Sequence, residues 1–245
     1  MTRRAVVAAK LGMSEPTLHR IETGKVPVSP ANVRALCWLY GIESTVTDAL
    51  AELALGTTRG DWWDASPAVP DWLKMYVELE AGASGIAIYS DEIVPGELQT
   101  EGYARALLAG VGAVDVEAVK LRVRRQKALL GRVPAVPIVA VLGESAVRRL
   151  VGGEGVLAEQ VEFLRQLARL EHVRIKVLPF AAGAHAGMAG AFRILDFDDP
   201  DDPDVVYLES YLGAVYLEAP AEVAEYRRVF ALIEREAVPL EDYRR

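Results

Sequence analysis

The chain has 245 residues, a length that fits one large domain or a small domain followed by a medium one. About half of the residues (51%) are apolar and 25% are charged, as in ordinary globular proteins. No apolar run approaches the roughly 20 residues that span a bilayer, and the short basic start, interrupted by Lys10, is unlike a secretory signal. One cysteine and three histidines exclude an internal disulfide and leave little material for a metal site. We therefore expect a cytoplasmic protein without membrane contact, cofactor or metal.

The net charge of −8 is unevenly distributed along the chain. Residues 1–40 carry six Lys or Arg against two Glu, a net +4, which leaves −12 for the other 205 residues. A basic head on an acidic body suits local contact between the head and a polyanion such as DNA. The imbalance is small, and chance fluctuation between short windows explains it equally well.

The first 56 residues are predicted to form a small all-α domain. Apolar spacing and capping residues predict helices over 3–11, 14–23, 30–40 and 46–55. Gly12 ends the first helix, Ser14 caps the second and Gly24 ends it. Two short helices around a tight turn predict a helix-turn-helix.

Residues 57–70 are predicted to connect this head to the rest of the chain. The segment holds prolines and the pair Trp62-Trp63, with Trp72 shortly after it. These tryptophans could stack on bases, but little positive charge surrounds them. Flexible linkers are poor in tryptophan, so we expect rings that pack the two domains together.

From residue 71 onward, helical and strand patterns alternate. Helices are predicted over 71–79, 100–108, 114–130, 145–150, 156–170 and 221–237, and strands over 84–90, 137–142, 173–178, 191–197, 205–209 and 214–217. Strands separated by helices, then strands joined by hairpins, predict a mixed sheet with helices packed against it. The predicted fold is therefore multidomain: an all-α head and an α/β domain over 71–245.

Two parts of the chain resemble known families. Residues 11–24, with the ending Ile21-Glu22-Thr23-Gly24, resemble the Xre-type helix-turn-helix family. The remainder resembles a large actinobacterial group that joins such a head to one C-terminal domain of uncertain function, through residues 94–105, 125–126, 177–187, 206–209 and 216–220. Members are often encoded beside a small partner protein, and some are described as antitoxin-like regulators. The resemblance implies a DNA-binding transcription regulator with a protein partner.

The head departs from the Xre pattern at its start. Xre-type domains usually begin with one more helix, so this chain is expected to begin at the second one. Val6 and Val7 would have packed against that helix, and leaving them exposed would cost about 1.5–3 kcal/mol each. Two interpretations follow: the true start lies upstream, or the head has degenerated.

The candidate DNA contacts are Glu15, Thr17, His19, Arg20 and Lys25. In a helix-turn-helix, the N-terminal residues of the second helix enter the major groove. Thr17 and Arg20 could then reach bases or phosphates, and Lys25 a phosphate. Glu15 is unfavourable near phosphate and useful only if it accepts from a cytosine amino group. The alternative interpretation is an ordinary solvated surface.

The candidate ligand-binding residues of the larger domain are Gln99, Arg125, Glu144, His185 and Glu209. The glycines around His185 let backbone approach a ligand closely, although local bonding of a loop histidine to backbone is the commoner outcome. Carboxylates near strand ends can line a cleft, but salt bridges to arginines are commoner. No nucleophile motif is present, so we assign no catalytic residue and expect no enzyme.

The run from Asp198 to Asp204 holds five carboxylates in seven residues. Two prolines interrupt it, and it lacks the glycine and distal glutamate of a calcium loop. We therefore predict a solvated hairpin turn rather than a cation site.

The leading hypothesis is a transcription regulator that binds an operator as a homodimer, with a C-terminal domain that dimerises and receives a small partner protein or ligand. The alternative hypothesis is a head without DNA binding. In that case the C-terminal domain would bind a small molecule, or act as an enzyme with a cleft near His185.

Overall fold

In the computed structural model, the described residues are 3–26, 28–57, 71–110, 112, 116–198, 202–210 and 212–244. The chain divides into two compact units, one made of residues 1–82 with 199–203, the other of residues 83–198 with 204–245. The domain boundaries at 56 and 70 stay predictions, and the roles of Trp62 and Trp63 fall outside the described residues.

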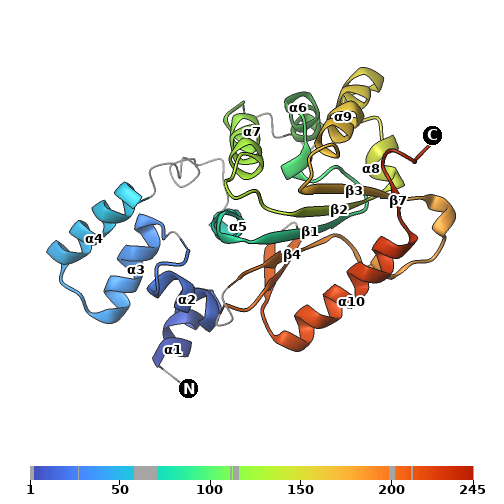
Figure 1. The fold of residues 1–245 in the computed structure, drawn as a ribbon. Helices are drawn as coiled ribbons and strands as arrows, with labels where there is room; N and C mark the ends of the chain where they lie inside the picture. Colours follow the sequence, from blue (N-terminus) through green and yellow to red (C-terminus); the bar gives the residue numbers. More distant parts are fainter. Residues whose placement is uncertain are drawn as a thin grey trace. The chain divides into compact units, whose positions relative to one another are not determined.

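The first unit contains the helices α1 (Arg3–Lys10), α2 (Glu15–Glu22), α3 (Pro30–Tyr40), α4 (Ser44–Thr57) and α5 (Asp71–Gly82), which Figure 1 labels. The Ser14 side chain accepts the Thr17 amide at 3.1 Å and so caps α2. Gly12 and Gly24 follow α1 and α2 with φ of 67° and 71°, a left-handed backbone that glycine adopts without strain. The predicted helices of the head are thus confirmed.

The small core of the head lies where α1, α2 and α3 meet. It consists of Val7, Ala8, Leu18, Ile21 and Leu36. Val7 is 6% exposed, so the expectation that it would be left uncovered is wrong, whereas Val6 is 41% exposed. One residue along a helix rotates a side chain by about 100°, which turns Val6 away from the face that Val7 buries. The prediction of a further helix upstream concerns residues outside this sequence.

The second unit is built on a mixed sheet of seven strands in the order β6-β5-β4-β1-β2-β3-β7. The strands are β1 (Gly85–Ser90), β2 (Ile138–Gly143), β3 (Val173–Leu178), β4 (Phe192–Asp196), β5 (Val205–Ser210), β6 (Gly213–Leu217) and β7 (Val238–Pro239). Neighbours among β1, β2 and β3 are parallel, and all other pairs are antiparallel. The predicted mixed sheet is confirmed. The two-residue β7 is an addition that no sequence pattern indicated.

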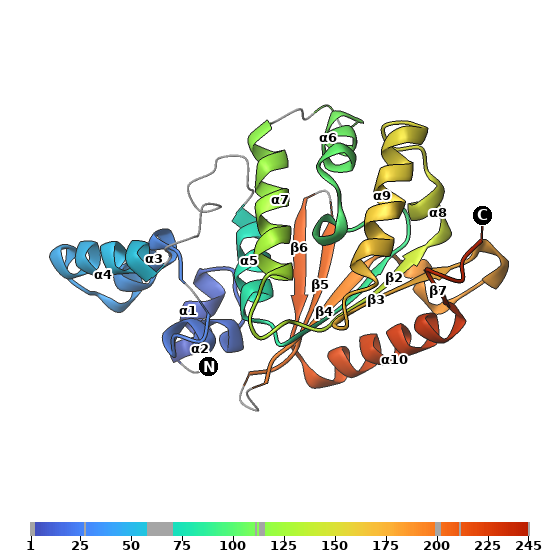
Figure 2. The same ribbon diagram turned by 45° about the horizontal axis from the view of Figure 1, so that its top comes forward.

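Helices cover both faces of this sheet. The crossover from β1 to β2 contains α6 (Glu101–Gly110) and α7 (Val116–Leu130), and that from β2 to β3 contains α8 (Glu144–Arg148) and α9 (Glu154–Leu167). Figures 1 and 2 show α6, α7 and α9 on one face and α10 (Pro220–Glu236) on the other. The α10 face holds an apolar core, which includes Tyr89, Val141, Phe192, Ile194, Val206, Phe230 and Ile233.

Strand alternation decides which side chains face α7. Phe192 and Ile194 of β4 and Val206 of β5 belong to the core under α10. Because successive strand residues point to opposite faces, Arg193 and Tyr207 point to the other face. These two residues are also direct cross-strand partners. The face toward the crossover helices therefore carries Arg193 and Tyr207 at the pairing of β4 with β5.

Candidate functional sites

The helix-turn-helix places its predicted DNA contacts very unequally. Glu15 and His19 of α2 are half-buried, and Lys25 is exposed just after the helix. Thr17 is 3% exposed, and its hydroxyl accepts a hydrogen bond from Ser14 at 3.0 Å. Arg20 is 0% exposed. The expectation that Thr17 and Arg20 reach out to DNA therefore does not fit their positions. Their side chains lie on the packed side of α2.

Arg20 has protein partners within the same compact unit. Its Nε atom lies 3.5 Å from a carboxylate oxygen of Asp202, and its guanidinium donates to the Pro203 carbonyl. Lys25 Nζ lies 3.7 Å from the other oxygen of the same carboxylate. Asp202 is only 7% exposed, so the prediction of a solvated turn is wrong at this residue. Asp199 and Asp201 fall outside the described residues.

In the second unit, the segment from Val94 to Thr100 is held in place by buried amide side chains. It includes the short 3-10 helix η1 (Gly96–Leu98). Gln126 donates to the backbone carbonyls of Glu97 (3.1 Å) and Gln99 (2.7 Å), and Gln160 donates to that of Leu98 (2.8 Å). Backbone polar groups buried in a loop need such partners. The segment is therefore fixed tightly enough to position the side chain of Glu97.

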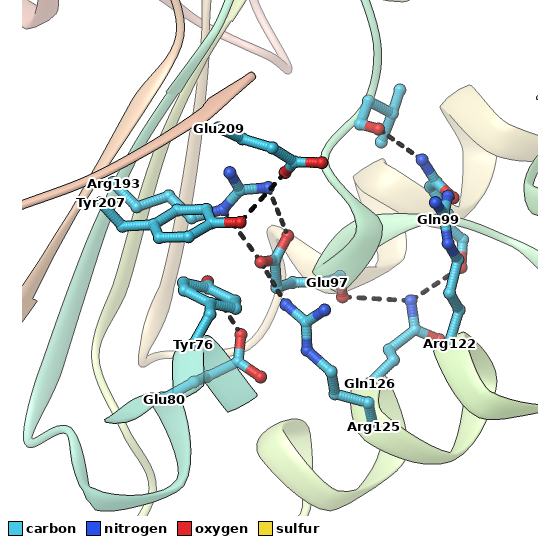
Figure 3. Close-up of polar contacts among 11 residues, drawn as sticks. Tyr76, Glu80, Glu97, Gln99, Arg122, Arg125, Gln126, Arg193, Tyr207 and Glu209 are labelled. Atoms are coloured by element: carbon cyan, nitrogen blue, oxygen red, sulfur yellow. Dashed lines mark hydrogen bonds and ion pairs between the residues drawn. The ribbon is translucent and has the colours of Figure 1, made fainter. Parts of the chain in front are cut away.

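Glu97 lies at the centre of an arginine cluster, which we define as Glu97, Arg122, Arg125, Arg193, Tyr207 and Glu209 (Figure 3). The Glu97 carboxylate is 0% exposed and contacts two guanidinium groups, with Oε1 2.5 Å from Arg125 Nη2 and 3.0 Å from Arg193 Nε. Both arginine side chains are 14% exposed. A buried carboxylate is tolerable only with partners of this kind.

The sheet supplies the other wall of the cluster. The Arg193 guanidinium lies 5.6 Å from the centre of the Tyr207 ring, a cation–π contact. The Tyr207 hydroxyl donates to Glu209 at 3.4 Å, and Glu209 itself is exposed. Burial raises the pKa of Tyr207, and the Glu209 carboxylate raises it further, so the phenol stays protonated. The cluster therefore extends from a fully buried carboxylate, Glu97, to a solvent-exposed carboxylate, Glu209.

Arg122 differs from the two arginines that contact Glu97. Its Nη1 atom donates to the Gln99 side chain at 3.0 Å, and within the described chain no carboxylate forms an ion pair with it. Burial lowers the pKa of Arg122, and the charges of Arg125 and Arg193 lower it as well, against the opposing effect of Glu209 and Glu97. A guanidinium stays charged at neutral pH even so. Arg122 is thus a half-buried cation that forms no ion pair among the described residues.

The helix spacing of α7 explains how these residues meet. Arg122, Arg125 and Gln126 are three and four residues apart and so share one face. Four basic residues in six positions predict a solvent-exposed face made of Arg122, Arg124, Arg125 and Lys127, and for Arg122 and Arg125 that prediction is wrong. Only Arg124 and Lys127 are exposed, because Gln99 and Glu97 provide partners for Arg122 and Arg125.

Three of the five predicted ligand residues therefore come together, and two do not. Gln99, Arg125 and Glu209 belong to or contact the arginine cluster. Glu144 lies at the end of β2, where it accepts from the Phe180 amide at 2.7 Å and from Arg148 at 2.6 Å. Burial would raise the pKa of Glu144, but these hydrogen bonds hold it below its usual range.

His185 contacts the backbone of its own loop and the ring of Tyr89. Its Nδ1 atom accepts the Gly187 amide at 3.1 Å, and its ring lies edge-on to Tyr89 with 6.2 Å between ring centres. A Cβ atom at Gly187 would lie 2.5 Å from the Tyr89 ring, so this glycine is needed for close packing. This is the local bonding that we gave as the commoner outcome for a loop histidine.

Sequence reasoning missed Glu97, Arg193 and Tyr207 as members of a site. Glu97 stood within the motif of residues 94–105 that carried the family resemblance, which was a usable signal. Arg193 sits alone in an apolar strand, flanked by Phe192 and Ile194, and an isolated charge in a buried strand is a second signal.

Comparison with known families agrees with this organisation. A profile described as "Domain of unknown function (DUF5753)" matches residues 73–245, and one described as "Helix-turn-helix domain" matches residues 2–50. The first match covers more than half of the chain, which therefore belongs to the DUF5753 family. No curated protein sequence is significantly similar to the chain. The protein is thus a helix-turn-helix regulator with a DUF5753 C-terminal domain.

None of the described helices combines the length and apolar character needed to cross a membrane. In the same part of the chain, no three His, Cys, Asp or Glu side chains gather as metal ligands would.

Proposed function

We propose that the protein is a transcription regulator that binds operator DNA through α2 and the residues that follow it. The observation that carries this proposal is the match of residues 2–50 to a helix-turn-helix domain, together with a capped α2 after a tight glycine turn. The exposed Lys25 would contact a phosphate, and the half-buried Glu15 and His19 would lie nearest the bases. Arg20 supports the helix from within.

The finer parts of the proposal rest on the family resemblance. We propose an antitoxin-like regulator that acts in the cytoplasm as a homodimer, because operators with two-fold symmetry match dimeric helix-turn-helix proteins. The C-terminal domain would dimerise and receive a small partner protein or a small ligand. Light scattering of the purified chain tests the dimer, since a monomeric mass at micromolar concentration would contradict it. The alternative of an enzyme cleft near His185 has no observation in its favour.

A gel-shift titration with the DNA upstream of the protein's own gene tests DNA binding. We expect the affinity to fall as salt rises, because phosphate contacts release counterions. Lys25→Ala should weaken binding and lower the slope of log affinity against log salt by about 1. Lys127→Ala, which removes an equal charge from an exposed position of α7, serves as the control and should change neither quantity. Absence of binding at low salt, or equal behaviour of the two variants, would contradict the proposal.

A further inference from the structure

The arginine cluster carries more positive charge than its own carboxylates neutralise. The cluster contains three guanidinium groups, those of Arg122, Arg125 and Arg193, and two carboxylates, those of Glu97 and Glu209. Glu97 is occupied by Arg125 and Arg193, and Glu209 is exposed to solvent. The surplus charge therefore resides at Arg122.

The geometry of Arg122 also leaves donors available. A guanidinium has five N–H groups in a planar fork. In the described part of the chain, Arg122 makes one side-chain hydrogen bond, from Nη1 to Gln99 Oε1. The Gln99 amide nitrogen donates to the Val94 carbonyl at 2.7 Å, which fixes its oxygen toward Arg122. One edge of the fork is thus anchored, and the remaining N–H groups have no acceptor among the residues that the structure describes.

We propose that this cluster is a binding site for the oxyanion group, carboxylate or phosphate, of a small molecule, held by Arg122 with the support of Arg125 and Arg193. Arginine is the residue that best matches planar, two-point recognition of such groups. Figure 3 shows Glu97 between Arg125 of α7 and Arg193 of β4, with Glu209 near Arg193 and Arg122 beside Gln99. The solvent-exposed Glu209 carboxylate would accept a hydrogen bond from a hydroxyl or amino group elsewhere on the same ligand.

A purely structural cluster would have a different charge count. The ion pairs of Glu97 with Arg125 and Arg193 are enough to connect η1 to α7 and β4. Arg122 adds a cation that its surroundings disfavour, and burial of an uncompensated charge is unfavourable unless something else compensates it. An oxyanion provides that compensation. This inference deepens the proposed function by naming the ligand class, and because its test involves no DNA, the two can fail separately.

Thermal unfolding of the full chain with inorganic phosphate or citrate, against sodium chloride of equal ionic strength, tests the site. At about ten times the dissociation constant, either anion should raise Tm by ~3 °C more than chloride does. The anion that gives the larger effect distinguishes a phosphate ligand from a carboxylate one. Arg122→Gln should abolish the specific part of the shift, whereas Lys127→Gln, with the same charge change on exposed α7, should retain it.

Calorimetric titration with the same anions gives a second readout. Arg122→Gln should weaken binding about 10- to 100-fold, the contribution of a charge-assisted hydrogen bond. Arg122→Lys should recover part of this loss, and Glu209→Gln, which removes a nearby negative charge, should tighten binding. Phosphate and citrate stabilise many proteins non-specifically. If wild type, Arg122→Gln and Lys127→Gln respond equally to both anions, the proposal is overturned.

Discussion

Two buried carboxylates of the sheet domain, Glu97 and Glu144, are stabilised by different kinds of partner. Glu97 is wholly enclosed and faces two guanidinium groups with a third close by. Glu144 keeps 10% of its side chain exposed, and its partners are one solvent-exposed arginine and a backbone amide. Glu144 is therefore locally neutral, whereas the surroundings of Glu97 hold surplus positive charge. The difference suggests a structural role for Glu144 and a ligand near Glu97.

Among the substitutions that test this difference, Glu97→Gln should have the largest effect on stability. It leaves Arg125 and Arg193 buried without their carboxylate, so we expect the free energy of unfolding to fall by about 3–5 kcal/mol. Urea denaturation measures it. The control is Glu101→Gln, which removes an exposed pair with Arg105 and should cost less than about 0.5 kcal/mol. Equal small losses would mean that Glu97 does not organise the cluster.

In the helix-turn-helix unit, the buried charge of Arg20 likewise has a buried carboxylate as its partner, and this predicts a structural role for Arg20. Because its guanidinium is wholly buried beside Asp202, Arg20→Ala should lower the free energy of unfolding of the full chain by about 2–4 kcal/mol. Arg34→Ala, which breaks an exposed pair with Asp48, should cost below about 1 kcal/mol. A stable Arg20→Ala protein that has lost DNA affinity would instead make Arg20 a DNA contact, as its position in the sequence indicates.

The loop that contributes the Phe180 amide to Glu144 continues to the tight contact at Gly187. Gly187→Ala would place a methyl group against the Tyr89 ring and should destabilise the protein by about 1–3 kcal/mol. Gly155→Ala is the matched control, because it lies in α9 with open space around it and should be stabilising by about 0.5–1 kcal/mol. Thermal melts of both variants distinguish packing at Gly187 from a general effect of replacing glycine. An unchanged melt for Gly187→Ala would show that the loop is not closely packed there.

Glu144 should make a small, pH-dependent contribution to the stability of the protein. Because its folded-state pKa is lowered, ionised Glu144 stabilises the protein fully above the unfolded glutamate pKa near ~4.3, and this contribution is lost as pH falls through the lower folded value. Glu144→Gln should therefore cost about 1 kcal/mol at neutral pH and progressively less in acid. Denaturation midpoints between pH 7 and pH 3 measure this, and a pH-independent difference would contradict it.

Much of the fold was predictable from local patterns. Capping by Ser14, the glycine stops and the apolar spacing located the helices of the head, because these signals depend on residues a few positions apart. The alternation of helix and strand after residue 71 likewise indicated the mixed sheet. The charge pattern of α7 was misleading, since four basic residues in six positions are typical of a solvated face. Their true division into inner and outer pairs depends on Gln99 and Glu97, which lie 23 and 28 positions before Arg122 and Arg125 in the chain.

Local sequence patterns were enough to predict the element types, the helix-turn-helix and the capping that defines it. The pairing of β4 with β1 rather than β3 is settled by packing between distant elements, and it brings Arg193 beside Glu97 across 96 positions of chain. The burial of Arg20 likewise depends on a residue far away in the sequence, Asp202. Local structure depends on nearby residues and is readable from the sequence, whereas the partners of a buried charge are chosen by packing between elements that lie far apart in the sequence.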